Sequence, residues 1–186
     1  MTHAVMLFFD AQTEAAIQAV WKELDETGTA PYLHRSANRP HFKLAIYEDL
    51  DVAASRPRLE LIAASVAGMP VHFKSLGIFS NARPTVFVAP SVTPALLDLQ
   101  IRASGALNDL GKCPPFDFFL PKHWVPHCLL GFDLEPEKLT GVLECALRLR
   151  LPFDGRIEEI GLVEFHPVRH LFSFPLAGDG SREASI

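Results

Sequence analysis

The chain has 186 residues, of which 48% are hydrophobic and 21% are charged, enough apolar material for one compact domain with a substantial core. Its net charge of −5 and pI near 5.9 argue against a protein that coats duplex DNA by neutralising many phosphates. A small nucleotide or an RNA end in a locally basic site is compatible with this charge.

The sequence carries no signal for a membrane or an oxidising compartment. No stretch approaches the ~18 apolar residues of a membrane span, and no basic region precedes the short apolar run near the N-terminus. The three cysteines, Cys113, Cys128 and Cys145, are odd in number and scattered, which is typical of reduced thiols. We therefore expect a soluble, cytoplasmic, monomeric protein with no membrane partner.

Strands and helices alternate along the first part of the chain. Apolar runs and helical spacing predict, in chain order, a strand over 5–9, a helix over 13–27, a strand over 40–47, a helix over 52–66, strands over 76–79 and 84–89, and a helix over 93–107. In the first helix Ile17, Val20, Trp21 and Leu24 should face inward, and Gly28 should end it.

The second part of the chain follows a long Pro-rich loop over 112–124. It predicts a strand over 126–133, a helix over about 137–149, and strands over 160–163 and 171–176. We expect a single domain over 1–177 and a disordered tail over 178–186. The alternation predicts an α+β domain with a concave, mostly antiparallel sheet in two lobes.

Two segments of the chain match each other. Each opens with Pro-His and runs into apolar sequence, at Pro40-His41 and at Pro126-His127, so the two histidines are 127 − 41 = 86 positions apart. A helix and then an apolar-Pro step follow each segment, which indicates a strand-helix-strand repeat over about 40–80 and 126–165. Two similar halves can bring both imidazoles to one cleft across a pseudo-two-fold axis, the geometry of a general acid–base pair.

Strand alternation predicts which side chains accompany the histidines. Residues two apart share a face of a strand, so His41, Lys43 and Tyr47 should point one way while the apolar residues between them pack on the core. His127 should likewise share a face with Leu129. One histidine alone is most simply structural, but two in matched places favour a functional role.

A metal site is a competing hypothesis, because His123 and His127 are four positions apart, as are His166 and His170. A proline lies inside each spacing and disfavours a helix, and on a strand residues four apart lie about 13 Å from each other. Cys128 cannot pair with its neighbour His127, because adjacent side chains leave opposite faces of a strand. We predict no metal, no other cofactor and no cysteine nucleophile.

Other side chains are candidates for the wall of the cleft. Lys43 can place its ammonium as a point charge on a phosphate, whereas Arg35 and Arg39 are expected mainly to solvate the loop before the first histidine. The loop over 112–124 is either a rigid connection packed on the core or a surface on which a base stacks. The candidate substrate-binding residues are Lys43, Tyr47, Phe118, His123 and Trp124.

The paired Pro-His strands resemble a known family. Together with the approach Trp124-Val125-Pro126-His127-Cys128 and the strand Leu76-Gly77-Ile78-Phe79, they are similar to the two-histidine phosphoesterase superfamily, specifically the 2′-5′ RNA ligase-like proteins. The likeness covers nearly the whole chain. It implies a bilobed α+β fold, with two pseudo-symmetric sheets lining a central cleft and helices outside. It also implies metal-independent chemistry on a 2′,3′-cyclic phosphate or 2′-5′ phosphodiester, in which His41 and His127 form the general base and acid pair and either one can be the base.

The chain departs from the family motif at two positions. That motif reads His, any residue, Thr or Ser, then an apolar residue, and its hydroxyls hold phosphate oxygens; here Lys43 and Leu129 replace them. Leu129 cannot donate a hydrogen bond, and losing one preorganised donor typically costs about 3–4 kcal/mol in the transition state. Two hypotheses follow: a weakened phosphodiesterase-like hydrolase of a small nucleotide or RNA end, and an inactive nucleotide- or RNA-end-binding protein. A purely structural domain would require side chains that fill the cleft.

Overall fold

The computed structural model describes residues 1–113 and 118–178, and its elements alternate as the sequence predicts. In chain order they are β1 (Thr2–Phe9), α1 (Ala11–Glu26), α2 (Tyr32–Arg35), β2 (His41–Glu48), α3 (Val52–Ser65), β3 (Met69–Phe79), β4 (Thr85–Pro90), α4 (Pro94–Gly105), β5 (Cys128–Gly131), the 3-10 turn η1 (Pro136–Lys138), α5 (Leu139–Ala146), the 3-10 turn η2 (Leu147–Leu149), β6 (Phe153–Phe165) and β7 (Arg169–Pro175). The tail expected from residue 178 lies, from residue 179 on, outside the described residues. Within the described residues, no helix has the length and apolar character to cross a bilayer.

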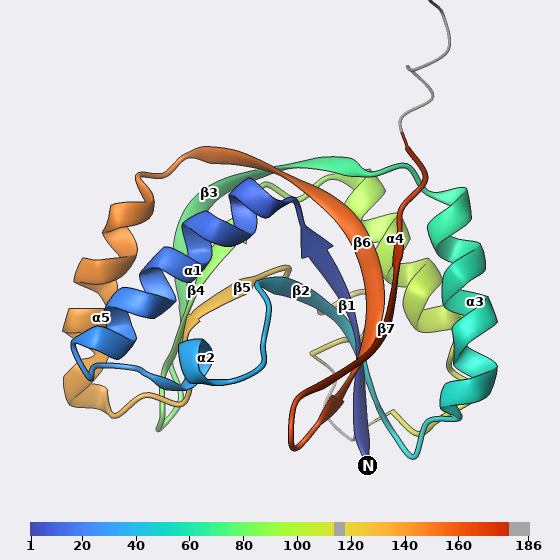
Figure 1. Cartoon of the computed structure of the whole chain (residues 1–186), viewed down its shortest axis with the longest axis horizontal. Coiled ribbons are helices and arrows are strands. Elements are labelled where there is room, and N and C mark those ends of the chain that lie inside the picture. Colours follow the sequence, from blue (N-terminus) through green and yellow to red (C-terminus); the bar gives the residue numbers. More distant parts are fainter. Residues whose placement is uncertain (114–117, 179–186) are drawn as a thin grey trace, which may run out of the picture.

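The strands form one antiparallel sheet in the order β2-β1-β6-β3-β4-β5, and β7 pairs with the outer part of β6. The pairing of β3 with β6 joins two arms. We name them the His41 arm (β1, β2, β6 and β7) and the His127 arm (β3, β4 and β5). Figure 1 shows how the sheet arches from one arm to the other. The α+β, bilobed fold class is confirmed, and the two sheets of the prediction are arms of one sheet.

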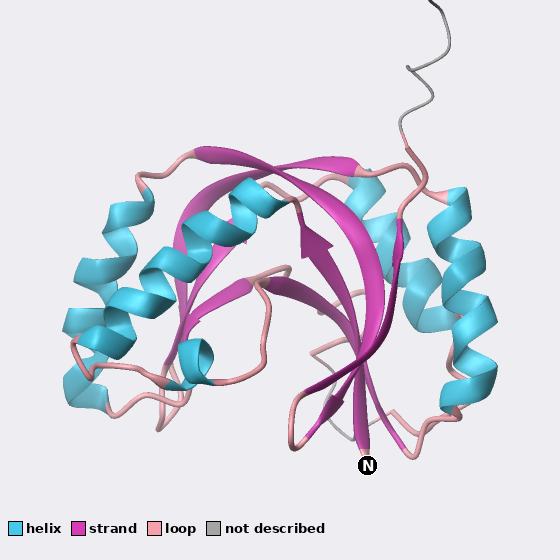
Figure 2. Ribbon diagram, in the orientation of Figure 1, coloured by secondary structure: helices cyan, strands magenta, loops and turns pink. Residues whose placement is uncertain are grey.

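Helices cover the outer side of each arm. Helices α3 and α4 pack on the His41 arm, and α1 and α5 pack on the His127 arm (Figure 2). Asp10 caps α1 by accepting a hydrogen bond from the Thr13 amide, and the four inward residues predicted for this helix are buried. The main core therefore lies between helices and sheet, which leaves the other side of the sheet, its inner face, for the site.

The two ends of the strand order meet. Strands β2 and β5, the first and last of the series, contact each other because the sheet curls. The curl therefore brings the starts of the two Pro-His strands together, although 86 positions separate them in the chain.

Each histidine-bearing strand contains a β-bulge at the same distance from its histidine. The register of β2 with β1 skips Leu44, and the register of β5 with β4 skips Leu130. Both residues lie three positions after the histidine, and an extra residue reverses the alternation of side chains beyond it. The repeat expected over about 40–80 and 126–165 stays a prediction. Each of its copies would begin at a histidine strand on one arm, β2 or β5, and end on the other arm, at β3 or β6.

The bulge in β2 corrects one predicted site residue. Beyond the bulge Tyr47 points into the main core, where it is fully buried and its hydroxyl donates to the Ser104 carbonyl at 2.6 Å. Ile46 instead lies on the inner face, beside a second buried cluster of Ala4, Met6, Phe8 and Val163. The prediction that Tyr47 shares the face of His41 is wrong, because simple alternation takes no account of the bulge.

Candidate active site on the inner face of the sheet

His41 opens β2 on the inner face. Its Nδ1 lies 2.6 Å from the carbonyl oxygen of Arg39, two residues back across Pro40. The ring packs at an edge-on angle against Phe8 from β1, with centroids 6.4 Å apart, and only 9% of the residue is exposed. The side chain is therefore held by backbone and by an aromatic neighbour.

His127 is held in the same way just before β5. Its Nδ1 lies 2.7 Å from the carbonyl oxygen of Val125, again two residues back across a proline. Two rings, Phe79 and Phe87, flank the imidazole at 5.0 and 5.2 Å. Gly77 makes room for them, since a Cβ there would lie 2.3 Å from the Phe87 ring. Both histidines thus make the same hydrogen bond, from Nδ1 to the carbonyl oxygen two residues back, one on each arm.

This hydrogen bond fixes the tautomer of each ring. A carbonyl oxygen only accepts hydrogen bonds, so each Nδ1 must carry the proton that it donates. In the neutral form of either histidine, Nε2 is then the basic nitrogen. The arrangement prepares two Nε2 atoms to accept or return a proton.

Burial and neighbouring positive charge lower the pKa values of the basic side chains at the site. Burial, together with the positive charge of Lys43, lowers the pKa of His41 to about 3; His127 and His170 add to the shift, and the bond to the Arg39 carbonyl opposes it. Burial also lowers the pKa of His127, by a smaller amount, while its bond to the Val125 carbonyl opposes the shift and Lys43 adds to it. The basic side chains of His41, Lys43, His127 and His170 therefore lie close enough for the charge of one to affect the pKa of another.

Lys43 lies on the inner face two residues after His41. Burial lowers its pKa to about 8, and its ammonium sits 4.7 Å from the centre of the Phe165 ring. Within the described residues no carboxylate pairs with it. Its charge acts on both histidines, which places it between the two arms.

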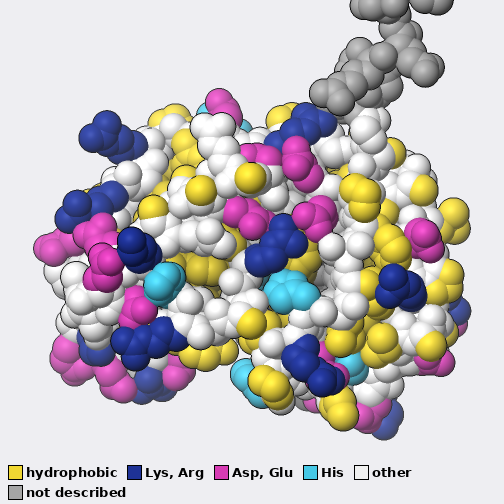
Figure 3. Space-filling view, in the orientation of Figure 1, with side chains coloured by type: hydrophobic (Ala, Val, Ile, Leu, Met, Phe, Trp, Pro, Cys, Tyr) yellow, Lys and Arg dark blue, Asp and Glu magenta, His cyan; other side chains and the backbone are white. Residues whose placement is uncertain are grey.

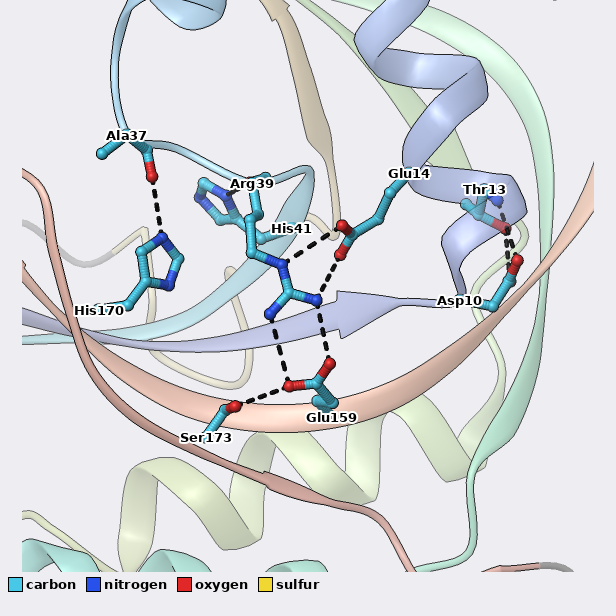
Figure 4. A network of polar contacts seen from close by, with 9 residues as sticks. All are labelled: Asp10, Thr13, Glu14, Ala37, Arg39, His41, Glu159, His170 and Ser173. Carbon is cyan, nitrogen blue, oxygen red and sulfur yellow. Dashed lines mark hydrogen bonds and ion pairs between the residues drawn. The ribbon is translucent and has the colours of Figure 1, made fainter.

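Arg39 forms ion pairs with two carboxylates instead of only solvating its loop. Its guanidinium donates to Glu14 at 2.8 Å and to Glu159 at 3.0 Å (Figure 4). It also stacks over the Phe8 ring, 4.4 Å from the ring centre. The hydroxyl of Ser173 also donates to Glu159, at 2.7 Å. This network ties the loop that carries His41 to α1 and β6, and so fixes the carbonyl that orients the imidazole.

His170, on β7, completes the group beside His41. Its Nε2 donates to the Ala37 carbonyl at 3.0 Å, and its ring packs on Phe8 at 5.5 Å. In the space-filling view, histidine, basic and acidic side chains gather across the middle of this side of the molecule, between the two arms (Figure 3). Sequence reasoning missed Glu14, Glu159 and this role of His170, because 25 and 120 positions separate the two carboxylates from Arg39.

The predicted loop residues are placed unequally. Trp124 is only 6% exposed and donates its indole N–H to the Lys43 carbonyl at 2.9 Å, so it supports the motif strand and presents no ring face to a ligand. Phe118 and His123 lie on the exposed part of the loop. Residues 114–117 of this loop lie outside the described residues. A role for Phe118 and His123 in substrate binding stays a prediction.

The chain's two tryptophans each donate a hydrogen bond to a backbone carbonyl at one of the two bulges. Trp124 bonds to the carbonyl of Lys43, and Trp21 from α1 bonds to the carbonyl of Leu129 at 2.8 Å. Each acceptor is the second residue after a histidine, next to the extra residue of the bulge, where the ladder is interrupted. Each indole thus supplies the partner that a buried carbonyl requires.

Metal and thiol chemistry find little support in this arrangement. Over residues 1–113 and 118–178, no three His, Cys, Asp or Glu side chains are grouped so that they could hold a metal ion. Burial raises the pKa of the Cys128 thiol to about 12, which keeps it protonated at neutral pH. Metal-independent chemistry stays a prediction that requires a functional assay.

Comparison with known proteins identifies the family. The 2′-5′ RNA ligase superfamily profile matches residues 9–169, whereas no curated protein sequence matches the chain. Similar solved structures include TT0787 of Thermus thermophilus, with a TM-score of 0.66 and 16% identity over 96% of this chain and 100% of that one. E. coli LigT complexed with 3′-AMP has a TM-score of 0.59 and 16% identity over 95% and 99%. Kluyveromyces marxianus Usb1 has 0.52 and 15% over 94% and 98%. Because the family profile covers most of its length, the chain belongs to the 2′-5′ RNA ligase superfamily, within the two-histidine phosphoesterases.

Proposed function

We propose that the protein is a phosphodiesterase-like hydrolase that acts on a 2′,3′-cyclic phosphate or a 2′-5′ phosphodiester of a small nucleotide or RNA end. The observation that carries the proposal is the matched pair of histidines. Each lies on the inner face, each donates Nδ1–H to a carbonyl two residues back, and each leaves Nε2 as its basic nitrogen.

The proposed reaction needs one proton acceptor and one proton donor. Nε2 of His41 takes a proton from a water molecule as its oxygen bonds to phosphorus. The bond between phosphorus and one ribose oxygen breaks, and Nε2 of His127 gives its proton to that oxygen. The products are a phosphomonoester and a ribose hydroxyl.

The order of the two pKa values supports this assignment of roles. His41 has the lower pKa, about 3, so it is neutral and able to accept a proton over most of the pH range. The pKa of His127 is lowered less, and a bound phosphate anion raises it, so His127 is the better proton donor in the complex. Lys43 balances the negative charge of the phosphate.

The ligands crystallised with a structural neighbour support a nucleotide substrate. E. coli LigT has been crystallised with 3′-AMP, NADP+, ATP and phosphate. These ligands share a phosphate group, and three of them carry a purine nucleotide. We extend the nucleotide class to this chain as part of the proposal.

The test is hydrolysis of 2′,3′-cyclic AMP by the purified protein in excess EDTA, followed by chromatography of the products. We expect 2′- or 3′-AMP to form at a rate that EDTA does not change, and to vanish with His41→Ala or His127→Ala. His72→Gln serves as the matched control, because His72 pairs with Asp154 where β3 meets β6. Loss of turnover in EDTA that zinc restores would overturn the metal-independent mechanism.

A catalytically inactive binding protein is the second candidate function, and Leu129 is the observation that favours it. This side chain stands beside His127 where the family motif has a hydroxyl, and it offers phosphate no hydrogen bond. If wild type binds 3′-AMP in calorimetry but turns over neither cyclic nor 2′-5′-linked substrates, the binding role replaces the enzymatic one.

A further inference from the structure

An exposed aromatic pair lies at the end of the His127 strand. Tyr32 of α2 and Phe132, the residue after β5, pack with ring centroids 5.8 Å apart and planes inclined by 39°. Their residues remain 43% and 46% exposed. Two aromatic rings from separate elements thus touch each other while nearly half of each stays open to solvent, which is uncommon for large apolar side chains in contact.

The bulge places Phe132 on the same face as His127. Gly131 faces the core, since a Cβ there would lie 2.9 Å from Val142, so the next residue points to the inner face. Its counterpart 86 positions earlier is Ile46, which lies on the inner face of the other arm. His127, Leu129 and Phe132 therefore follow one another on the inner face, along β5 and the residue at each of its ends, and about 13 Å of backbone separates the first from the last. A base attached to a phosphate held at His127 can extend along these residues.

Tyr32 is held in place by the short helix that carries it. Leu33, the next residue, is buried, while His34 and Arg35 both bond to Asp25 of α1, at 2.8 and 2.7 Å. Figure 1 shows α2 beside the far end of β5. These anchors keep the Tyr32 ring outside the core and against Phe132, so a ligand that stacks there meets a surface already formed.

The two sides of the site differ in the part of a substrate that they suit. Charged groups surround His41, whereas Phe79, Phe87 and Leu129 surround or follow His127. We propose that Tyr32 and Phe132 form a stacking subsite for the nucleobase of the substrate. This inference rests on the proposed function, because it places the phosphate at the two histidines. Bases stack on aromatic side chains with little dependence on their identity, so the subsite selects nucleotides over simple phosphate esters.

The test compares 3′-AMP with inorganic phosphate in calorimetry. Tyr32→Leu and Phe132→Leu keep an apolar side chain and remove the ring. We expect the Kd for 3′-AMP to rise about fivefold or more in each, up to about a hundredfold, while the Kd for phosphate stays within about twofold of wild type. Ile101→Ala, at an exposed apolar residue of α4, is the control and should change neither value. Melting curves check that each variant is folded.

The outcomes separate the subsite from the proposed function. If wild type binds 3′-AMP and both leucine variants bind it equally well, the subsite is overturned and the proposed function stands. An equal loss of affinity for 3′-AMP and for phosphate would also overturn it, because the rings would then act on the phosphate site. If wild type binds neither ligand, the proposed function fails and the subsite fails with it.

Discussion

The two arms share a backbone design and differ in the side chains placed on it. In both, a Pro-His step begins the strand, the imidazole donates to a carbonyl two residues back, and a bulge follows whose carbonyl accepts from a tryptophan. Around His41 the neighbours are charged: Lys43, and the Arg39 guanidinium between two carboxylates. Around His127 they are apolar rings and Leu129.

This difference separates two tasks of the site. The shared backbone sets where the two Nε2 atoms lie, because main-chain bonds do not depend on the identity of the neighbouring side chains. The side chains then decide which part of a substrate each arm accepts: the His41 arm suits the negative charge and the His127 arm an uncharged, flat group. The two arms should therefore respond differently to substitution and to pH.

Removing either imidazole should abolish most of the catalytic activity. We expect His41→Ala and His127→Ala each to lower kcat for 2′,3′-cyclic AMP by about 10²–10⁴-fold, the usual contribution of a general acid or base. Both histidines lie on the inner face rather than between helices and sheet, so both variants should fold; steady-state kinetics measure the activity and circular dichroism checks the fold. Full activity in one of the two variants would mean that the arms are not a catalytic pair.

The pH profile should distinguish the roles of the arms. The base, His41, has a pKa of about 3 and stays unprotonated above that value. Protonation of this base therefore lowers kcat/KM only in strong acid. The acid, His127, has a pKa below the ordinary 6.5, so kcat/KM should fall as pH rises toward neutrality, approaching tenfold per pH unit. We expect an optimum below pH 6.5 in a profile of initial rates. An optimum well above pH 7 would contradict the assignment.

Restoring a hydroxyl to the His127 arm should sharpen the comparison. Leu129→Thr supplies the donor that the family motif has there, and we expect turnover to rise about tenfold or more. Leu129→Val has nearly the same shape as the threonine variant and no donor, so it should leave turnover near the wild-type value. Equal rates for the two variants would show that a hydroxyl at this position does not stabilise the transition state.

Removing the charge from the His41 arm should weaken binding and stabilise the fold. We expect Lys43→Met to raise the Kd for 3′-AMP by about tenfold, a typical value for one charged hydrogen bond. The folded-state pKa of Lys43 is about 8 against an ordinary 10.5, so the unfolded chain holds the proton more strongly, and stability is lost as pH falls from 10.5 toward 8. The variant should therefore melt higher than wild type at pH 7, and this difference should shrink between pH 8 and 10.5.

Substitution of the tryptophans should have the smallest effect, a modest loss of stability. Trp21→Phe and Trp124→Phe each leave one bulge carbonyl without its donor, at an expected cost of about 1–3 kcal/mol in the free energy of unfolding. Urea unfolding measures both. Costs of similar size would support equivalent bulges, and a cost near zero for either would mean that water or another donor serves that carbonyl.

Much of the fold could be predicted from local sequence patterns. The Pro-His repeat predicted the two strands and the family, and the helical spacing of α1 predicted its four buried side chains correctly. These features depend on residues near each other in the chain, where periodicity is informative.

Features that depend on register or on distant partners escaped sequence reasoning. The bulge at Leu44 reversed the face of Tyr47, and no residue type at that position signals a bulge. Trp124 looked like a stacking surface because it lies in an aromatic loop, yet its indole bonds to β2, 81 positions earlier in the chain. The partners of Arg39 come from α1 and β6, and only the folded sheet brings them together. The short helix α2, which carries Tyr32, has too few residues for a periodic pattern.

The central claim is that one phosphate is held between the two histidines, and a crystal structure with 3′-AMP tests it most directly. We predict the phosphate on the inner face, with one oxygen about 2.6–3.2 Å from Nε2 of His41, another at that distance from Nε2 of His127, and Lys43 beside them. A phosphate that contacts one histidine alone, or that binds away from the inner face, would contradict the account.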